Sequence, residues 1–251
     1  MDLNGKVALV TGGAIRVGRA IALALAAGGA DVVISYNSSD VEARRTEADI
    51  VALGRQALAV KADVSQASQV QALIDATATR FGRLDVLVNS ASLWKDTPWP
   101  EVSEADWDLL QGVAVKGAFL CAKAAAPHLV THGAGAIVNI VDLSALVPFP
   151  GFLPHSAAKA ALLNLTYALA MEMAPAVRVN AVAPGAVLPP PGYTEEQIAI
   201  AKKTTLLQRW GTAEDVARTV VFLAESPYIT GALIPVDGGE MLAWRKHQFY
   251  E

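Results

Sequence analysis

The chain has 251 residues, of which 53% are hydrophobic and 18% charged, values that exclude a disordered protein and favour one domain with a large buried core. The formal net charge of −4 gives no reason to expect a nucleic-acid partner, and the single cysteine, Cys121, excludes an internal disulfide. No uninterrupted apolar run reaches about 18 residues and the start has no signal-peptide layout, so we expect a cytoplasmic protein without a membrane partner.

Short β-branched runs alternate with Ala-rich segments along the chain. The strands are expected at residues 7–11, 31–36, 57–61, 84–89, 136–142, 178–182 and 233–236, and the helices at 16–28, 41–53, 68–81, 104–129, 155–174 and 212–224. The strands are nearly continuous apolar runs, as in strands that are covered on both faces. The pattern predicts a Rossmann-type α/β fold: a doubly wound, seven-stranded parallel sheet with helices on both faces, spanning residues 1–251 as a single domain.

One segment interrupts this alternation. Residues 184–208 contain the Pro triplet of PPPGY and then a short polar stretch with helical character. Because a long insert after a strand end is a usual place for a substrate-covering loop, we predict a substrate loop at about residues 186–208.

The first predicted strand runs directly into TGGAIRVGRA, which opens the first helix. Gly12 and Gly13 permit a tight turn close to a pyrophosphate, Gly18 permits close packing, and the helix N-terminus favours a negative charge. This pattern predicts a dinucleotide site, although many such turns carry glycine for packing alone.

The end of the second strand, ISYNSSD, lacks the acidic residue that holds the ribose hydroxyls of NAD. Asp40 comes later, where the next helix begins, and is interpreted as a helix cap. Arg16 lies within the glycine turn, where its guanidinium could reach a 2′-phosphate, unless it is only a solvated side chain. We therefore predict NADP as the cofactor.

The most informative stretch is residues 139–159, NIVDLSALVPFPGFLPHSAAK. It predicts a strand, a Pro/Gly-rich loop and a helix, and brings Asp142, His155 and Lys159 to one strand end. His155 and Lys159 are four residues apart and so share a helix face.

With these motifs the chain resembles the short-chain dehydrogenase/reductase family over nearly its whole length. TGGAIRVG is similar to the family's cofactor turn, ADV to its adenine-contacting strand end, NSA to its NNAG segment and APG to its PG turn. YITG and VDGG are similar to its C-terminal signature. The resemblance implies contacts with the cofactor from Gly12, Ile15, Arg16, Val17, Tyr36, Asn37, Ser38, Asp63, Val64, Asn89, Ser90, Ala91, Lys159, Pro184, Gly185 and Val187. It implies no metal site.

Within the family the chain most resembles the pteridine reductases. Arg16 replaces the middle glycine, VD replaces the usual SS, NSASLW resembles their NNASSF segment, and LLQR is also similar. The resemblance implies that Ser92 and Trp94 contact substrate, with Trp94 stacking on a planar ring.

The family's catalytic residues are Asn, Ser, Tyr and Lys. These positions carry Ala114, Asp142, His155 and Lys159, so two of the four depart even from the pteridine reductases. Lys159 binds the nicotinamide ribose in the family, and Ala114, a strong helix former, leads us to expect a straight helix without the usual water relay.

His155 and Asp142 are expected to form a proton-transfer pair, unless Asp142 only caps a turn and His155 is only a satisfied residue at the helix start. A useful proton donor would have to be the imidazolium, which Asp142 favours and Lys159 opposes, so distance and burial decide the outcome.

The main hypothesis is an NADP-dependent reductase of a C=N or C=O bond in a small, pterin-like planar substrate. The alternative enzyme is a 3-oxoacyl-carrier-protein-type carbonyl reductase. A third hypothesis, of a different class, is a non-catalytic NADP-binding protein. The apolar helix at 155–174 also suggests a homodimer or homotetramer.

Overall fold

A computed structural model describes residues 1–131, 133–189 and 192–243 of the chain. Seven strands in this described part form one parallel sheet in the order β3-β2-β1-β4-β5-β6-β7, which confirms the predicted fold class. Its strands are β1 (Val7–Thr11), β2 (Asp31–Tyr36), β3 (Ala57–Lys61), β4 (Val86–Asn89), β5 (Gly135–Ile140), β6 (Val177–Pro184) and β7 (Leu233–Val236).

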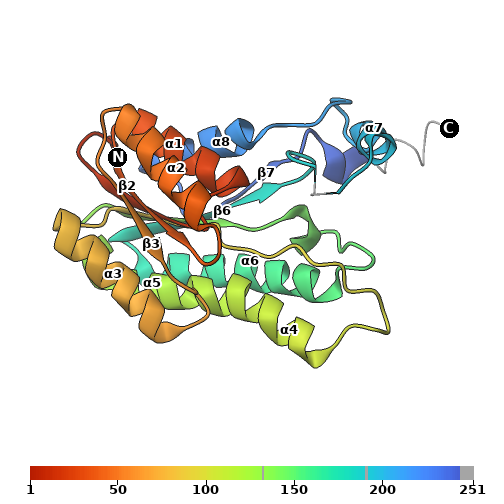
Figure 1. The fold of residues 1–251 in the computed structure, drawn as a ribbon, viewed down its shortest axis with the longest axis horizontal. Coiled ribbons are helices and arrows are strands. Elements are labelled where there is room, and N and C mark those ends of the chain that lie inside the picture. The colour runs from red at the N-terminus through yellow and green to blue at the C-terminus, as the bar shows by residue number, and fades with distance from the viewer. Residues whose placement is uncertain (132, 190–191, 244–251) are drawn as a thin grey trace.

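Helices cover both faces of this sheet. They are α1 (Arg16–Ala27), α2 (Asp40–Ala52), α3 (Ala67–Phe81), α4 (Glu104–Gln111), α5 (Gly117–Thr131), α6 (Leu153–Met173), α7 (Glu195–Lys203) and α8 (Ala213–Glu225). Helices α1, α2 and α8 lie on one face, while α3, α4, α5 and α6 lie on the other (Figure 1). Apolar side chains therefore point from the strands into core clusters on both faces of the sheet, which explains why the strands are nearly continuous apolar runs.

The expected helix at 104–129 is not a straight α-helix, and that expectation is wrong. A π-helical segment, Gly112–Lys116, separates α4 from α5, and Ala114 lies within it, 5% exposed. The whole run Glu104–Thr131 is the one helix in the described residues that is long and apolar enough to cross a membrane by length and composition. It packs against α6 and the sheet, so tertiary contacts rather than the helix propensity of alanine set its local geometry.

The end of β5 and the start of α6, both near residues 139–159, also differ from the prediction. β5 stops at Ile140, so Asp142 lies beyond the strand and begins a short 3₁₀ turn. Helix α6 starts at Leu153, two residues before His155, because Pro154 is readily accommodated in a first helical turn.

The segment after β6 contains the expected short helix, α7, which a reciprocal cap between Thr194 and Gln197 starts. Figure 1 shows α7 at the end of the molecule, apart from the two helical layers. Trp210 Nε1 donates a hydrogen bond to Ile198 O at 3.0 Å and ties α7 to the chain that follows.

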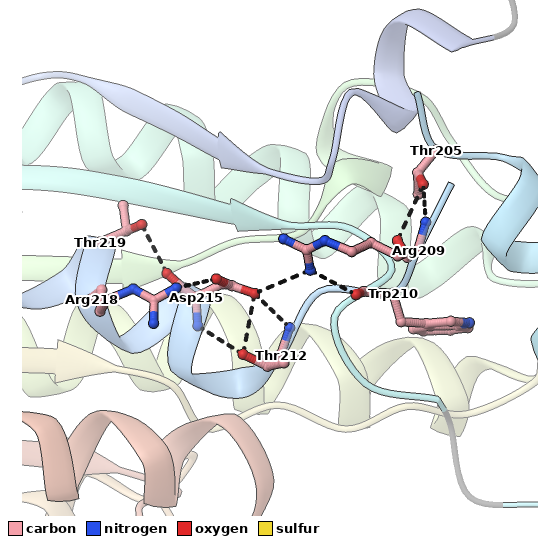
Figure 2. Close-up of polar contacts among 7 residues, drawn as sticks. All are labelled: Thr205, Arg209, Trp210, Thr212, Asp215, Arg218 and Thr219. Carbon is pink, nitrogen blue, oxygen red and sulfur yellow. Dashed lines mark hydrogen bonds and ion pairs between the residues drawn. The ribbon is translucent and has the colours of Figure 1, made fainter. Parts of the chain in front are cut away.

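The C-terminal end of this segment is fixed to α8 by a polar network (Figure 2). The Arg209 guanidinium donates to Trp210 O at 3.0 Å and lies 3.9 Å from Asp215, which also caps α8 through Thr212. Thr205 Oγ1 accepts a hydrogen bond from the backbone N–H of Arg209. The predicted substrate loop is therefore anchored at its far end.

Candidate functional site

The strand order reverses between β1 and β4, since the chain proceeds outward from β1 to β3 and then from β4 to β7. In parallel sheets of this kind, ligands bind outside the carboxyl ends of the strands at such a reversal. The glycine turn follows β1, the segment from Asn89 to Trp94 follows β4, and Asp142 follows β5. The sequence-predicted residues therefore gather at the usual binding edge of the fold.

Glycines in the first turn are required by close backbone approach. Gly12 has φ +64°, and a Cβ there would lie 2.9 Å from Ala91 Cα. A Cβ on Gly18 would lie 2.2 Å from Gly12 O, so no other residue fits without moving the turn. Ile15 is the N-cap of α1, and no side chain caps this N-terminus, so its first N–H groups are open to a phosphate.

Arg16 adopts φ +52°, a conformation that glycine occupies without strain. Its Nη2 donates a hydrogen bond to Pro189 O at 3.0 Å, which joins the glycine turn to the predicted substrate loop. Val17 is partly buried behind it. In this structure the guanidinium is thus directed to the loop, and the contact of Arg16 with a 2′-phosphate stays a prediction.

The end of β2 has no carboxylate facing outward. Asn37 and Ser38 are exposed, whereas Tyr36 is 6% exposed and packs into the core, leaving mainly its backbone for a ligand. Asp40 is the first residue of α2, with Ser39 as the N-cap, and its Oδ2 lies 3.5 Å from Lys61 Nζ.

The residues after β3 are organised by local hydrogen bonds. Asp63 Oδ1 accepts from the backbone N–H and hydroxyl of Ser65, at 2.9 and 2.7 Å. Val64 is buried against Gly117, and a Cβ added to Gly117 would lie 2.8 Å from Val64 Cγ2. Asp63 therefore shapes the chain after β3, where the family resemblance predicts the adenine contact.

After β4, the side chain of Asn89 points into the protein, where its amide donates to Asn139 Oδ1 at 2.8 Å. The backbone N–H groups of Ser90 and Ala91 donate to Thr11 Oγ1 at 3.0 and 3.1 Å. This arrangement holds the segment beside the glycine turn, so Asn89 acts here by positioning the backbone.

The turn after β6 is equally close-packed. A Cβ on Gly185 would lie 2.6 Å from Glu240 Oε2, which also accepts the backbone N–H of Ala186 at 2.9 Å. Burial raises the pKa of the Glu240 carboxyl above its usual value. Pro184 ends β6, and Val187 is buried behind the turn. Glu240 is a residue of this turn that the sequence motifs did not reveal.

Lys159 is buried, and its Nζ donates a hydrogen bond to Ile140 O at 2.9 Å. Desolvation lowers the pKa of its ammonium to about 8, although the charge of Asp142 acts in the opposite direction. An ammonium buried this deeply with one hydrogen bond has donors left for a ligand.

His155 is also buried, with 4% of its surface exposed. Its Nδ1 lies 3.2 Å from Leu93 O, while its Nε2 is buried without a hydrogen-bond partner in the described residues. Burial and the neighbouring Lys159 charge lower the pKa of the imidazole, and Asp142 raises it only in part. Burial therefore favours the neutral imidazole over the imidazolium, a choice that the sequence left open.

Asp142 makes no hydrogen bond to His155, so the two side chains of the predicted proton-transfer pair are not in direct contact, and Asp142 caps a turn, as the alternative from the sequence had it. Its Oδ1 accepts the backbone N–H of Ser144 at 2.8 Å and caps the 3₁₀ turn Leu143–Ala145. β5 ends before Asp142, and the turn captures the carboxylate. The charge of Asp142 nevertheless acts on His155 and Lys159 through space.

An aromatic cluster borders His155. The Trp94 ring lies 4.2 Å from Phe152, 6.5 Å from Phe149 and 5.0 Å from His155, measured between centroids. Trp94 is 42% exposed and Ser92 is exposed beside it, so both residues predicted to contact substrate are accessible. Sequence reasoning missed the two phenylalanines, which stand in the PFPGF loop.

Comparison with known proteins places the chain in a family. The family model described as enoyl-(acyl carrier protein) reductase matches residues 13–240. A 3-oxoacyl-[acyl-carrier-protein] reductase of Synechocystis sp. is 40% identical over 245 residues, which are 96% of this chain and 98% of that protein.

Solved structures agree. A short-chain dehydrogenase from Burkholderia cenocepacia in complex with NADP has a TM-score of 0.90 and 36% identity, over 96% of this chain and 100% of that one. A blue fluorescent protein from a metagenomic library in complex with NADPH has a TM-score of 0.89 and 33% identity, over 96% and 99% of the two chains. The chain belongs to the short-chain dehydrogenase/reductase family of oxidoreductases.

Proposed function

We propose that this oxidoreductase uses NADP(H) to interconvert a carbonyl and a hydroxyl group on an acyl thioester of the 3-oxoacyl type. The observation that carries the proposal is the 40% identity to a 3-oxoacyl-[acyl-carrier-protein] reductase over almost the whole of both chains. The pteridine-reductase resemblance rested on a few short motifs, and no relative reported above bears that name, so the alternative stated from the sequence becomes the leading hypothesis.

NADP is supported by three features of the chain. The uncapped N-terminus of α1 suits a pyrophosphate, and the Gly12 and Gly18 backbone leaves no side chain in its way. The end of β2 offers the exposed Asn37 and Ser38 rather than a carboxylate that would repel a 2′-phosphate. The cofactor would supply or accept a hydride.

The protein's own residues would bind and orient the reactants. Lys159, fixed to Ile140 O, would donate its remaining hydrogens to ribose hydroxyls. His155 would face the reacting oxygen, and Trp94 would line the substrate side with the aromatic cluster. Asp142 would act on His155 by charge, without contact.

A panel of 3-oxoacyl thioesters, ketones and pterins, each with NADPH and with NADH, tests the function. We expect turnover of a thioester with NADPH, and a loss of at least about tenfold in turnover for His155→Ala. Faster reduction of a pterin would instead favour the planar substrate, for which the exposed face of Trp94 is the supporting feature.

The non-catalytic hypothesis is kept as the second candidate, because His155 and Ala114 replace two of the family's four catalytic residues. It predicts NADPH binding without turnover of any substrate in the panel, and no gain of activity in His155→Tyr. Reduction of one substrate that is lost in a Lys159 variant would exclude it.

We also propose a cytoplasmic homodimer or homotetramer. Tyr167 and Met171 on the outer face of α6 are 39% and 76% exposed, which leaves apolar surface for a second copy. Sedimentation of the purified protein tests this, and a monomer at micromolar concentration would contradict it.

A further inference from the structure

The two ring nitrogens of His155 have different surroundings. Nδ1 lies 3.2 Å from the carbonyl oxygen of Leu93, and a carbonyl oxygen can only accept a hydrogen bond. The contact therefore assigns the ring hydrogen to Nδ1. In the neutral ring this leaves Nε2 with a lone pair and no hydrogen.

That lone pair lies in a buried place. His155 is 4% exposed, and Nε2 has no hydrogen-bond partner among the described residues. A buried acceptor without a partner destabilises the folded protein, and a bound hydrogen-bond donor would remove that cost. The atom therefore points to a ligand that donates a hydrogen.

The charges around the ring do not reverse this assignment. Lys159 approaches on the same helix and opposes a positive ring, while Asp142 approaches from the chain after β5 and favours one. The segment from Asn89 to Trp94 contributes only neutral groups, the Leu93 carbonyl and the Trp94 ring. Burial and Lys159 prevail, and they lower the pKa of the imidazole.

We propose that His155 is a hydrogen-bond acceptor and general base, whose Nε2 binds the hydroxyl of an alcohol substrate and takes its proton during oxidation. The proposal rests on the proposed function and specifies its substrate form: a secondary alcohol, such as a 3-hydroxyacyl thioester. The hydroxyl proton goes to Nε2, the hydride on the carbinol carbon goes to NADP⁺, and the C–O bond becomes a carbonyl. The products are the ketone, NADPH and one proton, which the imidazolium later releases to water.

The protonation state of His155 determines how kcat/KM depends on pH in the oxidative and in the reductive direction. Oxidation uses the neutral ring, which prevails above its pKa, so kcat/KM for the alcohol is constant through neutral pH. Reduction requires the imidazolium, so kcat/KM for the ketone falls about tenfold for each pH unit above that pKa, starting below about pH 6.5. A tyrosine donor, whose ordinary pKa is about 10, would keep reduction constant over this range.

The test measures both directions from about pH 5.5 to about pH 8.5, with a 3-hydroxyacyl thioester and NADP⁺ and with the matching 3-oxoacyl thioester and NADPH. His155→Gln, which retains polar atoms but does not titrate, should abolish the slope of the reductive profile. His155→Tyr should move it to higher pH, and His128→Gln, on α5, should leave it unchanged. A wild-type reductive profile that stays flat to about pH 8 would overturn the proposal.

A second measurement does not depend on activity. Nitrogen-15 NMR of the histidine rings, with His155→Gln to assign the signal, reports which nitrogen carries the hydrogen. We expect a neutral His155 at pH 7 with the hydrogen on Nδ1, and a hydrogen on Nε2 instead would overturn the proposal. If no thioester reacts while Nδ1 carries the hydrogen, the proposed function fails and the acceptor assignment of Nε2 holds.

Discussion

Lys159→Met is expected to remove a pH dependence of stability that the buried ammonium imposes. The side chain is 3% exposed, and burial lowers its pKa from 10.5 to about 8. This difference means that folding disfavours the charged form by about 3 kcal/mol. Below about pH 8 both the folded and the unfolded chain are protonated and the folded protein carries this cost in full.

Between about pH 8 and about pH 10.5 the unfolded chain binds the proton and the folded chain does not, so stability rises with pH. From about pH 7 to about pH 9.5 the wild-type protein should therefore gain about 2 kcal/mol relative to Lys159→Met. The variant also leaves Ile140 O without its donor, but that loss does not change with pH and cancels in the comparison.

The measurement is denaturant unfolding of the cofactor-free proteins at several pH values. All other titrating groups are shared, so the difference between the two free energies of unfolding isolates Lys159. Two stability curves that run parallel from about pH 7 to about pH 9.5 would refute the reasoning, because the ammonium would then not be desolvated. NADPH affinity, measured alongside, should fall in the variant at every pH.

Three further changes test other parts of the site. Asp142→Asn keeps the acceptor for Ser144 N–H but removes the charge that raises the pKa of His155. The pH dependence of kcat/KM for the ketone should therefore move to lower pH. An unchanged pH dependence would exclude this through-space effect. Arg16→Gly relieves the strain of a positive φ, about 1 kcal/mol, but loses the hydrogen bond to Pro189 O. We therefore expect KM for substrate to rise while the ratio of NADPH affinity to NADH affinity stays the same. A selective loss of NADPH affinity would instead support the 2′-phosphate contact predicted from the sequence. Gly18→Ala should abolish NADPH binding in titrations, whereas Gly112→Ala, whose Cβ would approach nothing closer than 3.7 Å, should retain it.

The sheet was predictable because its signal is local. Most strands are nearly continuous apolar runs whose ends are marked by glycine, proline or polar residues, and the predicted strand ends fall within two residues of the observed ones. The short helix after β6 was predictable too, because the Pro triplet interrupts the alternation and a polar helical stretch follows it, whereas the substrate role of this loop stays a prediction. The π-helical segment was not, since alanine at position 114 favours an ordinary α-helix and only packing against α6 and the sheet indicates otherwise.

The candidate site was predictable in its residues but not in its contacts. Helical spacing places His155 and Lys159 on one face of α6, and the end of β5 brings Asp142 near them, yet no sequence pattern shows that Leu93, 62 residues away, supplies the carbonyl that sets the tautomer of His155. The sequence also left open whether Asp142 pairs with His155 or caps a turn, and the structure shows the cap, because β5 ends at Ile140 and the backbone of the next turn binds the carboxylate. Burial, which decides the charge of the imidazole, is likewise a tertiary property.

Each of the three ionisable side chains is held by a backbone group rather than by another side chain. Ile140 O holds Lys159, Leu93 O holds His155, and Ser144 N–H holds Asp142. Backbone groups persist through substitutions, so this scaffold can exchange the residue at 155 without losing the geometry around Lys159. It follows that His155→Tyr should bind NADPH as tightly as the wild type and differ only in its pH profile. A loss of NADPH binding in that variant would mean that His155 supports the scaffold, and that the chemistry and the framework of this site cannot be varied separately.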